Sequence, residues 1–350
     1  MLVASEPQNS SNMKPVYYSE YLQLDKILNA QEEESKKNGV RADDEMLFII
    51  IHQSYELWFK QILHEVGIVR ETFMKQNIED NSSDLHNAVH RMKRVTAILQ
   101  MLVDKVSILE TMTPLDFLDF RDFLRPASGF QSIQFKMLEA LLGLPFQKRF
   151  GQEYYLSQLN PSDVTRVKET EQAISLFELV KQWLERMPFL EKDTYWSEHT
   201  DFFETYRAIY IHSLQEGEKQ NSSSFDLCFS PETQNTDRRL STKANRAALF
   251  IMLFRDYPLL NAPFQFINTL LDIDELLAQW RYRHMNMVQR MIGRRIGTGG
   301  STGADYLKAA ADTHYVFKEF ADLTSFLIQR SRLPQLPHRL AAELGFTSKA

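Results

Sequence analysis

His52 lies on a helix face where its imidazole could act on a flat ligand. It follows "LFIII" and precedes "QSYELWFK", in the most apolar helical stretch of the chain. Steps of four, three and four residues put a ring-lined face on this helix: Phe48, His52, Tyr55 and Phe59. Two interpretations fit, a buried helix with a hydrogen-bonded histidine or a pocket for an indole, a haem or another flat ligand. An unpaired buried imidazole costs about 1–3 kcal/mol, so both interpretations require a partner for His52.

Arg121 lies in the phenylalanine-rich segment "LDFLDFRDFLRPASGFQSIQFKMLE". Helical spacing places it on one face with Phe117 and Leu124. A guanidinium in ring-lined surroundings seeks a carboxylate, because a charge-assisted bidentate pair offsets its desolvation. That carboxylate could belong to a flat, apolar amino acid bound as a ligand, or to the neighbouring Asp119 or Asp122.

Three other histidines have the spacing or setting of possible metal ligands. His284 lies in the amphipathic stretch "WRYRHMNMVQRM", where a single histidine is more often structural than a ligand, although imidazole is the commonest metal-binding side chain. His86 and His90 are one helical turn apart, but no glutamate follows His86 as in the metalloprotease motif. We therefore expect His86 and His90 to be surface residues.

The segment "GRRIGTGGSTGADYLK", residues 293–308, holds five glycines in eleven positions of a chain that has 12. A phosphate-binding loop is not predicted, because no strand precedes the glycines and no Gly-Lys-Ser/Thr follows them. Gly293 is expected to end the preceding helix. The hydroxyls of Thr298, Ser301 and Thr302 alternate with the glycines, so the segment is either a plain connector or a loop that closes over a polar ligand.

The elements that must position these residues are helical. Apolar residues recur at three- and four-residue steps in several long segments, and no sustained period-two pattern or internal repeat is present. The clearest helical segments are 43–76, 82–112, 162–187, 241–257 and 273–293. We predict an all-α fold, a bundle of long helices.

Length and composition predict one globular unit. Residues 1–14 are polar and expected to be disordered, and residues 15–350 form a single helical domain with an exposed polar loop or insertion at about 216–239. Of the residues, 43% are hydrophobic and 12% aromatic, which suits a large core.

Charge and cysteine content limit the partners. The net charge of −6 gives no overall attraction to nucleic acid or anionic membranes. Cys228 is the only cysteine, which excludes an intrachain disulfide. No signal peptide and no apolar run of roughly 20 residues is present, so we expect a cytoplasmic protein.

Together these segments resemble the tryptophan 2,3-dioxygenase family over nearly the whole chain. The long, specific motifs are "FIIIHQSYELWFKQIL", "LDFLDFRDFLRPASGFQSIQF" and "GTGGSTG". The resemblance implies a homotetramer with one haem b per subunit. It also implies cleavage of the indole C2–C3 bond of L-tryptophan by O2 to N-formyl-L-kynurenine, the first step of the kynurenine pathway.

The resemblance also implies site residues. His284 matches the axial ligand of the haem iron, and His52 the histidine that accepts the indole N–H. Arg121 matches the residue that pairs with the substrate carboxylate, and Thr298 the residue that contacts the substrate ammonium from a loop that closes as a lid. The remaining matches are pocket residues Phe48, Phe117 and Leu124, haem neighbours Ser128, Gly129 and Phe130, and Tyr18 and Tyr21, which reach a neighbouring subunit's site.

Departures from the family pattern are few. Asp43 stands where the family commonly has histidine, Arg283 precedes the axial histidine, and the glycine segment reads Ser-Thr rather than Ser-Ser. None removes a chemical group that the reaction uses. The alternatives are a related haem enzyme acting on another indole, a non-catalytic haem sensor and a plain scaffold. The retained Arg121 and Thr298 argue against a substrate that lacks the amino-acid group.

Overall fold

The protein is all-α, as predicted. The computed structural model describes residues 15–75, 83–146, 149, 156–157, 159–190, 192–196, 202–232, 238–293, 295 and 303–345. Within these ranges the regular structure consists of α-helices and short 3-10 turns, with no strand. The predicted tail, residues 1–14, and Thr298 lie outside the described residues.

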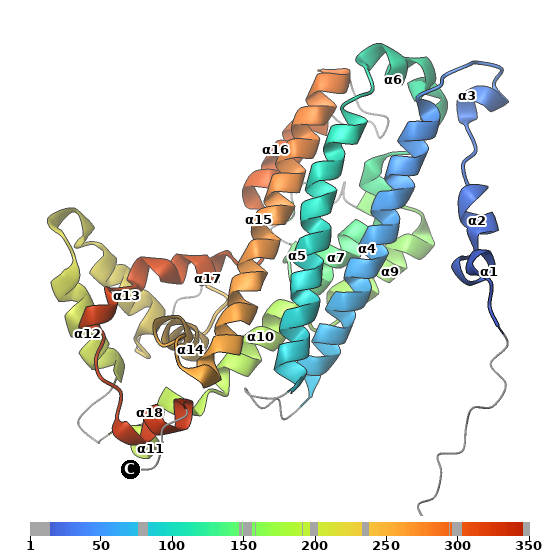
Figure 1. Ribbon diagram of the computed structural model, residues 1–350. Helices are drawn as coiled ribbons and strands as arrows, with labels where there is room; N and C mark the ends of the chain where they lie inside the picture. The colour runs from blue at the N-terminus through green and yellow to red at the C-terminus, as the bar shows by residue number, and fades with distance from the viewer. Residues whose placement is uncertain are drawn as a thin grey trace, which may run out of the picture.

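Three long helices form the frame of the molecule: α4 (Glu45–Met74), α5 (Ser83–Leu109) and α15 (Pro258–Ile292). In Figure 1 they run side by side, and α5 packs against both of the others. The predicted apolar stripe of α5 is buried along its whole length, which is why two helices can pack on it. Helix α15 ends at Gly293, whose φ of 59° suits glycine, as expected.

Shorter helices surround this frame. On the cavity side are α6 (Pro114–Arg121), α7 (Ile133–Leu142) and α16 (Gly303–Thr313). The others are α1 (Tyr18–Leu22), α2 (Leu24–Leu28), α3 (Glu34–Lys37), α9 (Pro161–Gln172), α10 (Leu176–Glu185), α11 (Lys192–Tyr195), α12 (Phe202–Ser213), α13 (Asn221–Phe229), α14 (Thr242–Leu253), α17 (Lys318–Asp322) and α18 (His338–Leu344).

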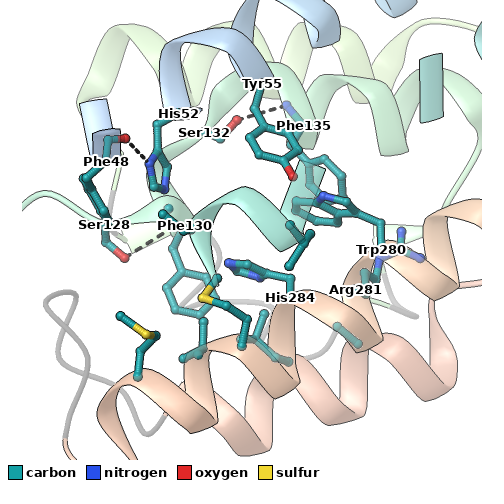
Figure 2. Close-up of a pocket in the computed structure, with 18 of the residues that line it drawn as sticks. Phe48, His52, Tyr55, Ser128, Phe130, Ser132, Phe135, Trp280, Arg281 and His284 are labelled. Atoms are coloured by element: carbon teal, nitrogen blue, oxygen red, sulfur yellow. Dashed lines mark hydrogen bonds between the residues drawn. The ribbon is translucent and has the colours of Figure 1, made fainter. Parts of the chain in front are cut away.

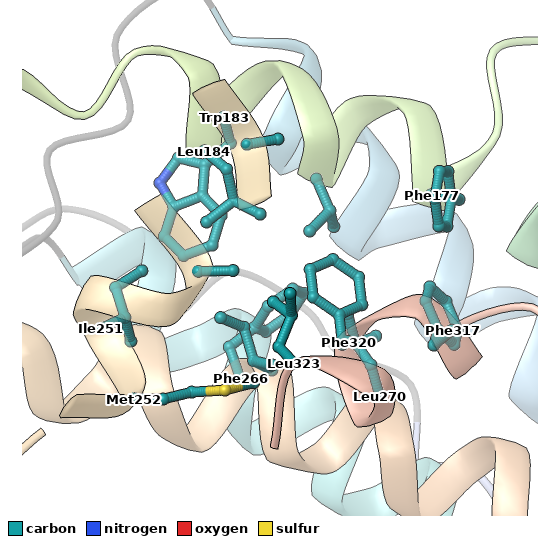
Figure 3. Packing of buried hydrophobic residues seen from close by; sticks show 14 of the residues in the cluster. Phe177, Trp183, Leu184, Ile251, Met252, Phe266, Leu270, Phe317, Phe320 and Leu323 are labelled. Atoms are coloured by element: carbon teal, nitrogen blue, oxygen red, sulfur yellow. The ribbon is translucent and has the colours of Figure 1, made fainter. Parts of the chain in front are cut away.

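Helix α15 takes part in two hydrophobic cores. Its first half packs in the larger core, where Phe266 and Leu270 meet Trp183 and Phe320 (Figure 3). Its last turns contribute Met287 and other side chains to a smaller core shared with α4, α5 and α6. One continuous helix therefore connects the two cores.

The predicted loop at 216–239 is wrong for Asn221–Phe229, which forms helix α13. Phe225, Cys228 and Phe229 lie three and four residues apart on one face and are buried. The rings of Phe225 and Phe229 lie 4.6 Å apart. Burial of this apolar face outweighs the polar composition of the segment.

The predicted single helix over 162–187 is also wrong, because it is divided into α9 and α10. Ser175 begins the second helix as its N-cap and accepts a hydrogen bond from the backbone N–H of Glu178 at 3.3 Å. The carbonyl of Ile174 is turned outward and accepts from Arg70 Nε at 3.0 Å. The break therefore has local polar partners that replace the helical hydrogen bonds.

Candidate active site

A cavity of about 290 Å³ lies between α4, the α6–α7 segment, α15 and α16. Figure 2 shows side chains from these helices pointing into it. Most of the residues that the sequence predicted for a site line its wall: Phe48, His52, Phe117, Arg121, Ser128, Gly129, Phe130 and His284. Residues more than two hundred positions apart in the sequence therefore meet at one place.

His52 presents one nitrogen to the cavity and fixes the other. Its Nδ1 lies 2.7 Å from the carbonyl oxygen of Phe48, one turn earlier on α4 (Figure 2). A carbonyl only accepts, so Nδ1 carries the proton and Nε2 is left as an acceptor. Burial lowers the pKa of His52, against the opposing effects of the Phe48 carbonyl and Glu56. The imidazole is thus a neutral hydrogen-bond acceptor.

His284 is a neutral imidazole held by stacking. Its ring lies 5.2 Å from that of Trp280, at an interplanar angle of 7°. Burial, and to a smaller extent the nearby imidazole of His52, lowers the pKa of His284 to about 4. The buried Nδ1 of His284 has no hydrogen-bond partner among the described residues. A neutral ring with a free lone pair has the form that binds a metal ion.

Arg121 brings a buried positive charge to the cavity. Helix α6 starts with a capping box between Thr113 and Asp116, and Arg121 is its last residue. Arg121 is only 5% exposed. Phe117, one turn earlier, lies 5.7 Å from the ring of Phe48. A guanidinium beside a wall of rings can bind the carboxylate of an aromatic amino acid.

The acidic neighbours of Arg121 face elsewhere. Asp119 is exposed. Asp122 lies 3.4 Å from Arg125 Nη2, in an ion pair at the surface. Arg121 itself lines the cavity, as the ligand-binding interpretation requires.

The segment after α6 forms another part of the wall. Ser128 caps a 3-10 turn at Gly129–Gln131, and its Oγ accepts from the N–H of Phe130 at 3.4 Å (Figure 2). Apart from its chain neighbours, no atom of the described residues lies within 4 Å of the position that a Cβ on Gly129 would take. The turn therefore presents Phe130 to the cavity beside open space.

Three predicted residues lie elsewhere, and a fourth is not described. Leu124 packs against the smaller core, as Phe48 and Phe117 also do, but it does not line the cavity. Tyr18 and Tyr21, on α1, are 75% and 76% exposed and do not reach the cavity of their own chain. Thr298 lies outside the described residues. His86 and His90 are exposed on α5, as expected.

Sequence reasoning missed a group of polar side chains at the cavity: Lys136, Glu139, Arg281 and His314. All four are buried, and they come from α7, α15 and the residue after α16. One signal was present, since "IQFKMLEALL" places Lys136 and Glu139 on one face of an otherwise apolar helix.

The side chains at the cavity fit a metal ion that is already bound by a flat organic ligand. No three His, Cys, Asp or Glu side chains gather as a metal site among the described residues. The neutral imidazoles of His52 and His284 both face this cavity, whose walls are mainly aromatic and aliphatic, and only His52 has a hydrogen-bond partner for its Nδ1 among the described residues. A bare ion needs more protein ligands than this, whereas an iron porphyrin supplies four nitrogens and needs one axial residue.

Comparison with known proteins gives one family. The family model described as tryptophan 2,3-dioxygenase matches residues 3–226 and 214–327. A protein named tryptophan 2,3-dioxygenase from Alteromonas mediterranea is 43% identical, over 96% of this chain and 98% of its own length. Proteins of the same name are 42% identical, over 95% of the chain and 98% of the relative in Bdellovibrio bacteriovorus, and over 96% and 90% in Dictyostelium discoideum.

Proposed function

Because the chain belongs to the tryptophan 2,3-dioxygenase family, we propose that it uses haem and O2 to cleave the indole C2–C3 bond of L-tryptophan. The product is N-formyl-L-kynurenine, and the reaction is the first step of the kynurenine pathway. The observation that carries the proposal is one cavity in which His52, His284 and Arg121 meet.

The cofactor would be haem b, one per subunit, and His284 would hold it by binding the iron. The neutral ring, its stacking on Trp280 and the apolar walls support this assignment. Ser128, Gly129 and Phe130 form the part of the wall that borders the porphyrin. Haem, when bound, supplies the activation of O2, which no protein side chain can perform.

The protein's own residues bind and orient the substrate. The Nε2 of His52 accepts a hydrogen bond from the indole N–H, and the rings of Phe48 and Phe117 pack against the indole. Arg121 binds the substrate carboxylate. Thr298 contacts the ammonium from a loop that closes as a lid. Holding both ends of the amino acid fixes the C2–C3 edge at the reacting position, which is the main contribution that binding makes to rate.

Helix α1 takes part in assembly. In a homotetramer, the exposed Tyr18 and Tyr21 enter the active site of a neighbouring subunit, while Leu124 supports the wall of its own. Exposure of two large aromatic residues on a short helix agrees with a surface that a second subunit covers.

We assign the protein to the cytoplasm. Among the described residues, no helix combines the length and the apolar character that a bilayer crossing requires.

The test is an absorption experiment on the haem-loaded protein. The full chain is reduced with dithionite under anaerobic conditions and then exposed to air and L-tryptophan. We expect a five-coordinate ferrous spectrum followed by growth of the N-formylkynurenine band, and neither in His284→Ala. A good haem spectrum without the product would favour an enzyme of another indole or a sensor. Absence of haem uptake would overturn the proposal.

A further inference from the structure

Helices α7 and α15 meet beside His284 through two pairs of side chains. Phe135 and Glu139 are one turn apart on α7, and Trp280 and Arg281 are neighbours on α15. Trp280 and Arg281 lie within one helical turn of His284, four and three residues before it. The packing of α15 on α5 and α16 places its backbone, and these side chains connect α7 to the stretch of α15 that carries His284.

The first pair is polar and almost completely buried. Arg281 Nη2 donates to Glu139 Oε1 at 2.7 Å, and Nη1 donates to the carbonyl of His314 at 3.1 Å. His314 Nδ1 donates to the same Glu139 oxygen at 3.2 Å. The side chains of Arg281, Glu139 and His314 are 4%, 6% and 3% exposed. Arg281 thus connects α15 to α7 and to the residue that follows α16.

The carboxylate of Glu139 stays ionised in this setting. Burial alone would raise the pKa of Glu139, but the hydrogen bond from His314 and the charge of Arg281 outweigh it and hold the pKa below its ordinary range. The three side chains therefore form one charge-assisted group, which we call the Arg281 cluster.

The second pair is aromatic and reaches His284 directly. The rings of Phe135 and Trp280 lie 4.9 Å apart, and the ring of Trp280 is parallel to that of His284 (Figure 2). A metal-bound histidine usually donates its second N–H to a carboxylate or carbonyl, which fixes the ring. Nδ1 of His284 has no such partner among the described residues. The orientation of the His284 ring then depends on its stacking against Trp280 and on the position of α15.

We propose that the Arg281 cluster, made of Arg281, Glu139 and His314, is a positioning device that sets the orientation of His284 toward the haem iron. This inference rests on the proposed function, because it requires a haem held by His284. A buried ion pair adds little net stability compared with apolar residues of the same shape. The Arg281–Glu139 pair instead fixes a relative position. The guanidinium of Arg281 can bond to both of its partners only when α7, α15 and His314 are in one arrangement.

The test compares two buried carboxylates. Glu139→Gln and Arg281→Lys disturb the Arg281 cluster. The control is Glu65→Gln, because Glu65 is also buried and accepts from Arg91 and Arg94 at 2.8 and 2.7 Å, away from the cavity. The readouts are the iron–histidine stretching band in the resonance Raman spectrum of the ferrous protein, and the rate of haem transfer to an acceptor protein.

We expect the iron–histidine band to shift or split in Glu139→Gln and Arg281→Lys, and haem transfer to become about tenfold faster. In Glu65→Gln both readouts should match wild type, even if the melting temperature falls. If the single variants fail to fold, the double variant Glu139→Leu with Arg281→Met replaces the buried pair by apolar side chains and receives the same measurements.

Two negative results are distinguishable. Folded cluster variants with the wild-type band and transfer rate would overturn the inference and leave the proposed function intact. A wild-type protein that binds haem without an iron–histidine band would overturn the assignment of His284, and the proposed function with it.

Discussion

Replacement of Arg121 by alanine should raise the KM for L-tryptophan steeply. Arg121 is 5% exposed and lies on the cavity wall beside Phe117, so a carboxylate that reaches it is removed from water. Under these conditions a hydrogen bond to a charged group contributes about 1.5–3 kcal/mol. Since about 1.4 kcal/mol corresponds to a factor of ten, the expected loss in kcat/KM is about 10- to 150-fold.

The assay uses a substrate pair that differs only in the carboxylate. Oxidation of L-tryptophan and of tryptamine is measured with wild type, Arg121→Ala and Arg121→Lys. For tryptamine the Arg121→Ala change should stay within about twofold, the range of independent effects. Lysine keeps the charge but loses the planar fork, so Arg121→Lys should recover part of the activity on L-tryptophan only.

The matched control is Arg125→Ala, because Arg125 is exposed and pairs with Asp122 at the surface. It should behave as wild type with both substrates. An unchanged KM for L-tryptophan in Arg121→Ala would remove Arg121 from carboxylate binding. Equal losses with both substrates would mean that Arg121 acts on the fold or on haem binding instead.

Three further outcomes are expected. Burial lowers the pKa of Lys136 to about 8, so between pH 8 and the ordinary value of 10.5 the unfolded chain binds more protons than the folded one. Relative to Lys136→Met, the free energy of unfolding of the wild type in urea should therefore rise across this window by on the order of 3 kcal/mol, and equal slopes in the two proteins would contradict the assignment. In Gly143→Ala, at φ 116°, the new Cβ would lie 2.8 Å from atoms of Phe177 and Ser175, so unfolding experiments should show a loss of about 2–4 kcal/mol. Gly39→Ala, at φ 72° in open space, should cost only about 1 kcal/mol, and equal losses would exclude the steric explanation. Burial raises the pKa of the Cys228 thiol, so Ellman's reagent should label it only after unfolding, and rapid labelling of native protein would refute its burial.

Much of the fold and of the cavity follows from local periodicity. The face that carries Phe48 and His52 was visible because four rings repeat at helical spacing in one segment. Arg121 stood out for a similar reason, as a charge among phenylalanines. For His284 the spacing alone left a structural histidine as the more frequent case, and the family motif supplied the assignment as a ligand.

What the sequence did not predict depends on contacts between distant segments. Glu139, Arg281 and His314 are separated by 142 and 33 positions, and nothing in any of the three segments specifies that they meet. The division between α9 and α10 rests on one capping serine, whose effect a periodic pattern hides. Helix α13 was missed because the buried face of Phe225 and Phe229 lies within a serine- and asparagine-rich segment.

The continuity of α15 has a thermodynamic consequence. Its 35 residues span about 50 Å, with Phe266 in the larger core and His284 at the cavity. A ligand that binds only the folded cavity lowers the free energy of every state in which α15 is intact. Opening of the larger core around α14 becomes rarer where that opening also disrupts α15, although no residue of α14 lines the cavity. Amide hydrogens of α14 should therefore exchange more slowly when the distant site is filled.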